Sequence, residues 1–125
     1  MQYTYYIIVK RHFDAAHFLR DYQGKCANTH GHTWEVCFYF KCLEMDRGYS
    51  DIIVDFKDLH EEIDKNLPDH KFLNEIYPFN PTAENLAKYF FDFYSVLVME
   101  KKWPVRLSRV EVWESPSSCA AYEAE

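Results

Sequence analysis

The stretch from His30 to Cys42 alternates between apolar and polar side chains with a period of two. One parity carries Trp34, Val36, Phe38 and Phe40, and the other carries Thr33, Glu35, Tyr39 and Lys41. This pattern is typical of a β-strand with one buried face. Because His30 and His32 share the parity of Trp34, we expect both imidazoles to extend the apolar face.

Two imidazoles on one face of a strand can bind one metal ion. A third, His17, ends the strand that the aromatic and β-branched run from Tyr5 to Ala16 predicts. Three neutral imidazoles with a fourth position open are typical of a catalytic zinc site. The alternative is that these histidines are ordinary core or surface residues. Cys26, in the polar loop 18–29, is either a reactive thiol beside the metal or an inert one.

Composition limits the classes of protein. The 125 residues predict a single domain, 1–125, and a net charge of -6 argues against a general nucleic-acid binder. The chain has no apolar run of the ~20 residues that span a bilayer. No secretion signal is visible, so we expect a cytoplasmic protein whose four cysteines are free thiols.

Two helices and two further strands follow a polar connection at residues 43–50. Asp55 is the expected N-cap of a helix that Pro68 ends, and Thr82 caps the second helix. The expected apolar face of that helix is made of Leu86, Tyr89, Phe90, Phe93, Val96 and Leu97. Residues 69–74 are expected to form an exposed turn. Strands at 105–113 and 119–123 complete the order ββααββ, an α+β fold with an antiparallel sheet whose open edges favour assembly.

Six separated motifs resemble the 6-pyruvoyl-tetrahydropterin synthase / 6-carboxytetrahydropterin synthase family. They cover nearly the whole chain in the right order: Phe13–His17, Cys26 with His30-Gly31-His32, Val54–Phe56, Leu67–His70 with Leu73-Asn74, Asn80–Asn85, and Trp113–Pro116. The three-residue gap between Cys26 and His30 is similar to the bacterial carboxy synthases of queuosine biosynthesis. One departure is Pro68, where the family pattern has Leu.

The resemblance implies a tunnelling fold, in which a four-stranded antiparallel sheet carries two helices on one face. Three such subunits close a barrel, two trimers commonly stack into a hexamer, and the active sites lie between subunits.

The resemblance also implies an activity, the conversion of 7,8-dihydroneopterin triphosphate to 6-carboxy-tetrahydropterin with loss of triphosphate and acetaldehyde. Zinc would be the cofactor, held by His17, His30 and His32. Cys26 would be the base, with His70 as its partner, oriented by Asp69. Glu114 would accept two hydrogen bonds from the pterin N–H edge.

Simpler interpretations stay open at each position. Asp69 and His70 are also compatible with a plain helix terminus, and Glu114 with a solvated strand end. His12 and His60 are not expected to be ligands, and Cys37, Cys42 and Cys119 are expected to be structural. Arg20, Lys25 and Lys71 are weak candidates for binding the triphosphate. The alternative functions are a pyruvoyl synthase and, from another class, a zinc-dependent hydrolase or a metal-holding binding module.

Overall fold

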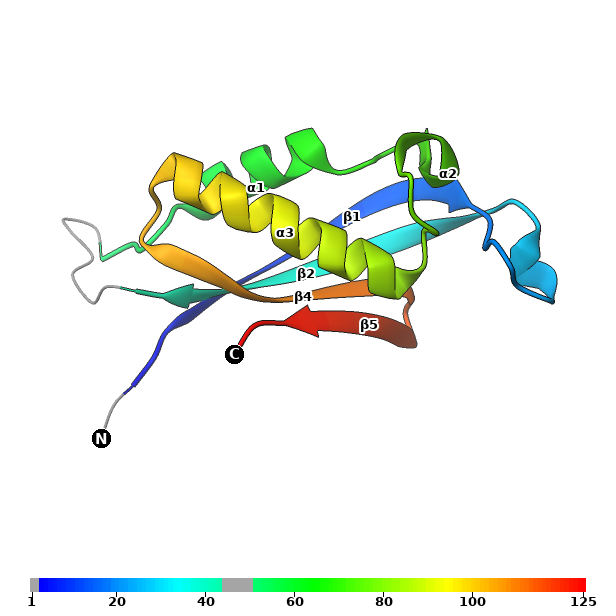
Figure 1. The fold of residues 1–125 in the computed structure, drawn as a ribbon. Coiled ribbons are helices and arrows are strands. Elements are labelled where there is room, and N and C mark those ends of the chain that lie inside the picture. Colours follow the sequence, from blue (N-terminus) through cyan, green and yellow to red (C-terminus); the bar gives the residue numbers. More distant parts are fainter. Residues whose placement is uncertain (1–2, 44–50) are drawn as a thin grey trace.

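The computed structural model describes residues 3–43 and 51–125, which form one mixed sheet with helices on one side (Figure 1). Its strands are β1 (Tyr6–His17), β2 (His30–Cys42), β3 (Lys71–Phe72), β4 (Val105–Ser115) and β5 (Ser118–Glu123). The helices are α1 (Phe56–Asn66), α2 (Leu73–Ile76) and α3 (Ala83–Lys101), with a short 3-10 turn, η1, at Lys25–Ala27. The strand order is β3-β1-β2-β4-β5.

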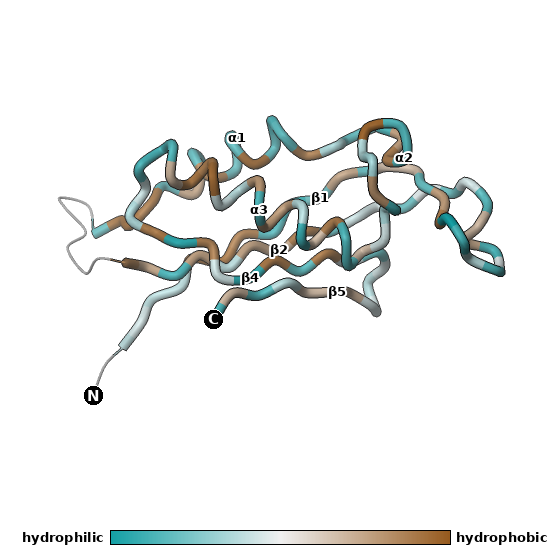
Figure 2. The backbone as a smooth tube through the Cα atoms, in the orientation of Figure 1, coloured by the Kyte–Doolittle hydropathy of each residue, from teal (hydrophilic) through white to brown (hydrophobic). Residues whose placement is uncertain are grey.

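The predicted alternation in β2 places its large side chains between the sheet and the helices. Trp34, Val36, Phe38 and Phe40 are all buried there. Phe13 of β1 stacks on Trp34, with ring centroids 5.9 Å apart, and Phe38 meets the edge of Tyr94 on α3 at 4.9 Å. The apolar positions along α3 and the strands form this layer (Figure 2).

Both predicted N-caps are confirmed. The Asp55 carboxylate accepts a hydrogen bond from the Lys57 amide at 2.9 Å, and the Thr82 hydroxyl accepts one from the Asn85 amide at 3.1 Å. α1 ends at Asn66, just before Pro68. These local signals therefore position both long helices over the sheet.

The expected apolar face of α3 is partly wrong. Val96 is 54% exposed and Phe93 is 37% exposed, whereas Tyr94 and Val98 are buried instead. The Tyr94 hydroxyl donates to the Ile63 carbonyl oxygen on α1 at 2.8 Å. A buried tyrosine is tolerated where its hydroxyl has such a partner, so tertiary packing selects a slightly rotated face of the helix.

The segment after α1 forms a strand and a short helix and not an exposed turn. We expected four strands, all antiparallel, and two helices, and the structure corrects this to a mixed sheet of five strands with three helices in the described residues. β3 pairs with β1 in parallel, with Ala15 opposite Lys71 and Ala16 opposite Phe72, and α2 follows directly. The His70 amide donates to the Asp14 carbonyl oxygen at 2.6 Å, which fixes the segment to β1. The α+β class is confirmed, and the four predicted strands are antiparallel neighbours. Most of the predicted 43–50 connection lies outside the described residues.

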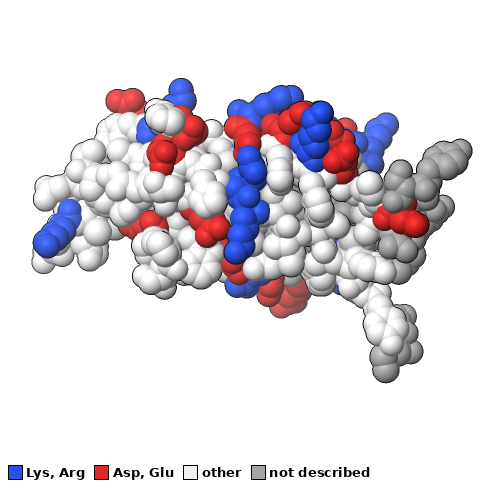
Figure 3. Space-filling view, turned by 180° about the vertical axis from the view of Figure 1, so that it is seen from behind, with Lys and Arg blue, Asp and Glu red and all other residues white. Residues whose placement is uncertain are grey.

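Charged side chains of both signs gather over α1 on the side of the molecule seen in Figure 3. Ion pairs there include Lys65 with Glu62 at 3.0 Å and Lys101 with the same carboxylate at 3.2 Å. Of the helices in the described part of the chain, none is long and apolar enough to span a membrane.

Candidate metal centre

The pairing of β1 with β2 brings the three predicted histidines together. In this antiparallel register His17 lies opposite His30, and Ala15 lies opposite His32. His17 is fully buried, while His30 and His32 are half-buried at the end of the apolar face. The cluster is therefore a direct consequence of strand parity and register.

The rings of His17 and His30 point the same nitrogen at each other. Their Nε2 atoms lie 3.0 Å apart. The Nδ1 of His17 lies 2.8 Å from the Pro81 carbonyl oxygen, and that of His30 lies 2.7 Å from the Asn28 carbonyl oxygen. A carbonyl oxygen only accepts hydrogen bonds, so each Nδ1 carries the proton. In the neutral rings two Nε2 lone pairs then face each other, an arrangement that a cation between them satisfies.

Glu114, from the end of β4, joins this cluster. Its Oε1 lies 2.8 Å from Nε2 of His32 and 3.6 Å from Nε2 of His17. The short contact to His32 lacks hydrogen-bond geometry, and among the described residues this Nε2 is buried without a hydrogen-bond partner. A buried polar atom without a partner is costly, and a cation at this nitrogen would satisfy it.

Burial lowers the pKa of both His17 and His32, although the Pro81 carbonyl and the Glu114 carboxylate oppose the change. Neutral imidazoles are the form that ligates a metal. The ligand atoms of His17, His30, His32 and Glu114 lie within 4.8 Å of one another, so the group could hold a metal ion. Carbonyl oxygens behind metal-binding imidazoles are the usual outer partners.

Asp69 and His70 face one another on the exposed side of this centre. His70 Nδ1 lies 2.9 Å from Asp69 Oδ2, and Asp69 Oδ1 accepts a hydrogen bond from the Asp14 amide at 2.9 Å. The Asp14 amide and then His70 lower the pKa of Asp69. The His70 side chain is 79% exposed and lines a hollow of about 630 Å³ together with His32. The structure thus brings His70 to the surface beside the candidate metal centre.

Cys26 lies in η1, in the loop that extends past the end of the sheet (Figure 1). It is half-buried, and it does not belong to the group of four ligands. The sequence therefore placed the thiol in a loop correctly, but the structure does not bring it into the histidine cluster.

Two asparagines, which belong to the motifs noted above but were given no role there, fix the start of this loop. The Asn74 side chain accepts from the Phe18 amide at 2.8 Å and donates to the Phe18 carbonyl oxygen at 3.0 Å. Asn80 does the same for Arg20, at 2.9 Å and 3.4 Å. Each side-chain amide thus makes the pair of backbone hydrogen bonds that a neighbouring strand would otherwise make. The role joins residues more than 50 positions apart, so no local sequence signal marks it.

A second hollow, of about 470 Å³, opens on the other side of His32. Glu114 and Trp113 line it from β4, and Thr33 and Glu35 line it from β2. His12, predicted not to be a ligand, lies 3.6 Å from Glu35 at the same hollow. Of the candidates for binding phosphate, Lys71 lines the His70 hollow, and Arg20 donates to the Pro78 carbonyl oxygen at 3.3 Å.

Comparisons with known proteins show the family of the chain. The model of the family 6-pyruvoyl tetrahydropterin synthase matches residues 6–125. A Synechocystis protein named 6-carboxy-5,6,7,8-tetrahydropterin synthase is 32% identical over 116 residues, covering 88% of this chain and 86% of that protein. A Haemophilus influenzae protein of the same name is 27% identical over 136 residues, covering 89% and 93%.

A solved structure shares the fold. Caenorhabditis elegans 6-pyruvoyl tetrahydropterin synthase aligns with a TM-score of 0.80 at 24% identity, over 98% of this chain and 96% of that one. This similarity confirms the tunnelling fold.

Proposed function

The chain belongs to the 6-pyruvoyl tetrahydropterin synthase family, and on that premise we propose that it is a zinc-dependent lyase of queuosine biosynthesis. In this proposal 7,8-dihydroneopterin triphosphate and water give 6-carboxy-5,6,7,8-tetrahydropterin, acetaldehyde and triphosphate. The observation that carries the proposal is the convergence of the His17 and His30 Nε2 atoms at 3.0 Å, with both Nδ1 atoms engaged by carbonyl oxygens.

The metal ligands in this proposal are His17, His30 and His32. Imidazole nitrogens suit zinc, and three of them leave one position for substrate. Bound zinc supplies Lewis acidity, which polarises substrate oxygens and acidifies neighbouring carbon-bound protons.

The proposed proton-transfer groups are Cys26 and His70. Asp69 contacts Nδ1 of His70 at 2.9 Å, which leaves Nε2 to give or take a proton in the adjoining hollow. Cys26 acts as the base at substrate carbon in its thiolate form. Because the thiol lies outside the ligand group, the proposal requires substrate, or a neighbouring subunit, to connect it with the cluster.

Glu114 is the proposed anchor for the pterin. A carboxylate accepts two hydrogen bonds from a guanidine-like N–H edge, and charge assistance strengthens such a pair. Glu114 and Trp113 both line the hollow of about 470 Å³ beside His32. Because Glu114 contacts His32, it could instead be a fourth ligand of the metal. The Glu114→Gln variant separates this role from pterin binding.

Assembly belongs to the same proposal. β1 pairs with β3 only at Ala15 and Ala16, so most of its outer edge has no strand neighbour among the described residues. Such an edge is usually covered, and the proposed cover is a second copy in a trimer or hexamer. We also place the protein in the cytoplasm, where its four free cysteines would stay reduced.

The second candidate is 6-pyruvoyl-tetrahydropterin synthase. The family model and the aligned Caenorhabditis elegans structure carry that name, whereas the Synechocystis and Haemophilus relatives carry the carboxy name. The carboxy reaction is favoured by those relatives and by the three-residue gap after Cys26. A hydrolase or a metal-holding module would need neither Cys26 nor Glu114.

The experiment is product identification after the purified protein is incubated with 7,8-dihydroneopterin triphosphate. The proposal expects equal amounts of carboxypterin and acetaldehyde. A pyruvoyl product without acetaldehyde would establish the second candidate. Recovery of the pterin side chain with only phosphate removed would establish a hydrolase.

A further inference from the structure

Two cations lie directly opposite each other on the face of the sheet away from the helices. Lys41 of β2 pairs with Arg106 of β4, and Tyr6 of β1 pairs with Lys41 on the other side. Cross-strand partners point to the same face, so these three side chains form one row. Like charges directly opposite each other destabilise a sheet, which makes this pair unusual in a chain with a net charge of -6.

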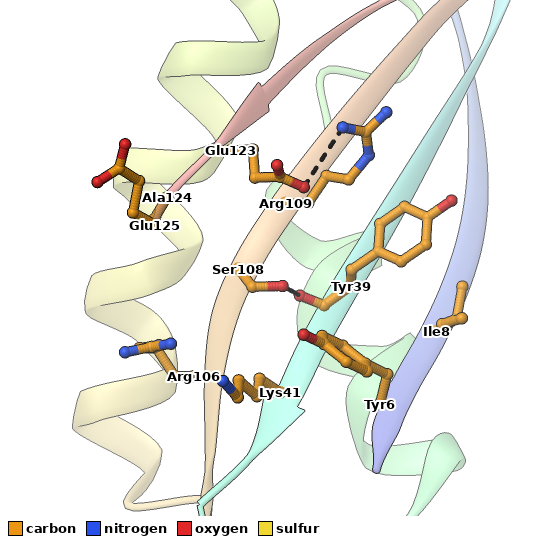
Figure 4. Close-up of a pocket in the computed structure, with 10 residues that line it drawn as sticks. All are labelled: Tyr6, Ile8, Tyr39, Lys41, Arg106, Ser108, Arg109, Glu123, Ala124 and Glu125. Carbon is orange, nitrogen blue, oxygen red and sulfur yellow. Dashed lines mark hydrogen bonds and ion pairs between the residues drawn. The ribbon is translucent and has the colours of Figure 1, made fainter. Parts of the chain in front are cut away.

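No carboxylate neutralises this pair within the described part of the chain. Lys41 and Arg106 have no ion-pair partner there, whereas the neighbouring Arg109 contacts Glu111 at 3.0 Å and Glu123 at 3.4 Å. Figure 4 shows Arg109 directed to Glu123, with the Lys41 and Arg106 head groups in a separate group at the other end of the hollow. Glu111 and Glu123, the acidic side chains nearby, thus form ion pairs with Arg109 and not with Lys41 or Arg106.

The pair borders a hollow of about 470 Å³, which Tyr6, Tyr39 and Ser108 also line. The Ser108 hydroxyl donates to the Tyr39 carbonyl oxygen at 3.1 Å, and the Tyr39 hydroxyl donates to Glu111 at 3.1 Å. Among the described residues, the side-chain donors left over are the two cations, the Tyr6 hydroxyl and the second terminal nitrogen of Arg109. Glu125 also lines the hollow, and its carboxylate, which forms no ion pair with any residue that the structure describes, would offset part of the charge.

The hollow is separate from the candidate metal centre. Lys41 and His32 both lie on β2, nine residues apart, a span of roughly 30 Å in a strand. The residues lining the two regions do not overlap.

We propose that Lys41 and Arg106, with the Tyr6 hydroxyl, bind a phosphate-type oxyanion that carries at least two negative charges. Arginine presents a planar fork that matches phosphate oxygens, and lysine adds a compact point charge. An anion of this kind bridges the two cations and removes their repulsion. The site stands apart from the proposed enzymatic reaction and does not depend on it.

The test uses inorganic phosphate as the probe, with calorimetric titration and thermal unfolding of the full chain. The variants are Lys41→Gln, Arg106→Gln and Arg106→Lys. Lys10→Gln is the matched control, because Lys10 is exposed on the same face of β1 as Tyr6 but does not line the hollow. His32→Ala reports anion binding at the metal centre.

We expect Lys41→Gln and Arg106→Gln each to lower the affinity for inorganic phosphate at least tenfold. Arg106→Lys keeps the charge but loses the fork, so its affinity should fall less. Without anion, Lys41→Gln should unfold at the wild-type temperature or above it, because a repulsion is removed. Lys10→Gln and His32→Ala should bind within twofold of wild type.

Three results would overturn the site: wild-type affinity in both glutamine variants, an equal loss in Lys10→Gln, or loss of binding in His32→Ala. The second would mean nonspecific attraction, and the third would place the anion at the metal centre. Pterin turnover by the same preparations tests the enzymatic proposal separately, so failure of one does not entail failure of the other.

Discussion

His17 and His30 face each other through their Nε2 atoms at 3.0 Å, while a backbone carbonyl oxygen holds each Nδ1. Two neutral rings held in this way have no hydrogen to share between them. Nitrogen ligands of one tetrahedral zinc lie about 3.3 Å apart when each Zn–N bond is about 2.0 Å. The pair is thus already close to the spacing that a shared metal requires.

Glu114→Gln should weaken pterin binding and leave the metal content unchanged. The amide keeps the shape of the carboxylate but loses its charge and one acceptor, and a charge-assisted hydrogen bond is about twice as strong as a neutral one. Calorimetric titration with a pterin and metal analysis of the same sample give both answers. If the variant loses its metal, Glu114 is a ligand, and if its pterin affinity is unchanged it is only a strand-end residue.

Cys26→Ala should retain fold and metal but lose turnover. Cys26 is half-buried in a loop and lies outside the ligand group, so its removal leaves the centre intact. Loss of a proton-transfer group typically costs about 10²–10⁴-fold in rate. The loss should appear in kcat, with little change in substrate affinity, and Cys119→Ala on β5 is the matched control. A fully active Cys26→Ala variant would remove the thiol from the mechanism.

Glu111→Gln should lower the free energy of unfolding by about 1–3 kcal/mol at pH 7. The buried Glu111 carboxylate accepts hydrogen bonds from Trp113 at 3.1 Å, Arg109 at 3.0 Å and Tyr39 at 3.1 Å. Burial alone would raise the pKa of Glu111, but these hydrogen bonds outweigh burial and lower it.

The sign of the pH effect follows from that lowered pKa. A carboxylate whose pKa is lower in the folded state stabilises the protein above its unfolded pKa, about 4.3 for Glu. That stabilisation is lost as the pH falls through the folded value. Urea unfolding of wild type and Glu111→Gln between pH 7 and pH 3 measures the difference between their free energies of unfolding. We expect this difference to shrink below pH ~4, and a difference that grows with acidity would contradict the prediction.

The protein should be a closed oligomer built on trimers. The outer edge of β1, which pairs with β3 only at Ala15 and Ala16, needs cover. Light scattering at micromolar concentration should give a mass of three or six chains. An active monomer under the assay conditions would show that neither the edge nor the site needs a second copy.

The sequence predicted what depends on periodicity. The alternation after His30 gave the bounds of β2, His30–Cys42, and the shared parity of His30, His32 and Trp34 placed two imidazoles at the end of the buried face. His17 at the end of β1 joined them through simple antiparallel register. The caps at Asp55 and Thr82 were equally local.

The rest depended on contacts between distant segments. β3 exists because the His70 amide reaches the Asp14 carbonyl oxygen, and its two residues are too short for periodicity to reveal. The apolar face of α3 was rotated because Tyr94 finds the Ile63 carbonyl oxygen. The approach of Glu114 to His32 likewise follows from how β4 lies beside β2, and only the register shows it.

Metal-dependent product formation tests most directly whether the protein is a metal-dependent pterin synthase. Acetaldehyde and carboxypterin are measured for wild type, chelated wild type, chelated wild type with zinc restored, His32→Ala and the control His60→Ala. We expect about one zinc per chain and full activity in wild type and His60→Ala, loss of both in His32→Ala and after chelation, and recovery with zinc. Equal zinc and equal product in wild type and His32→Ala would contradict the account.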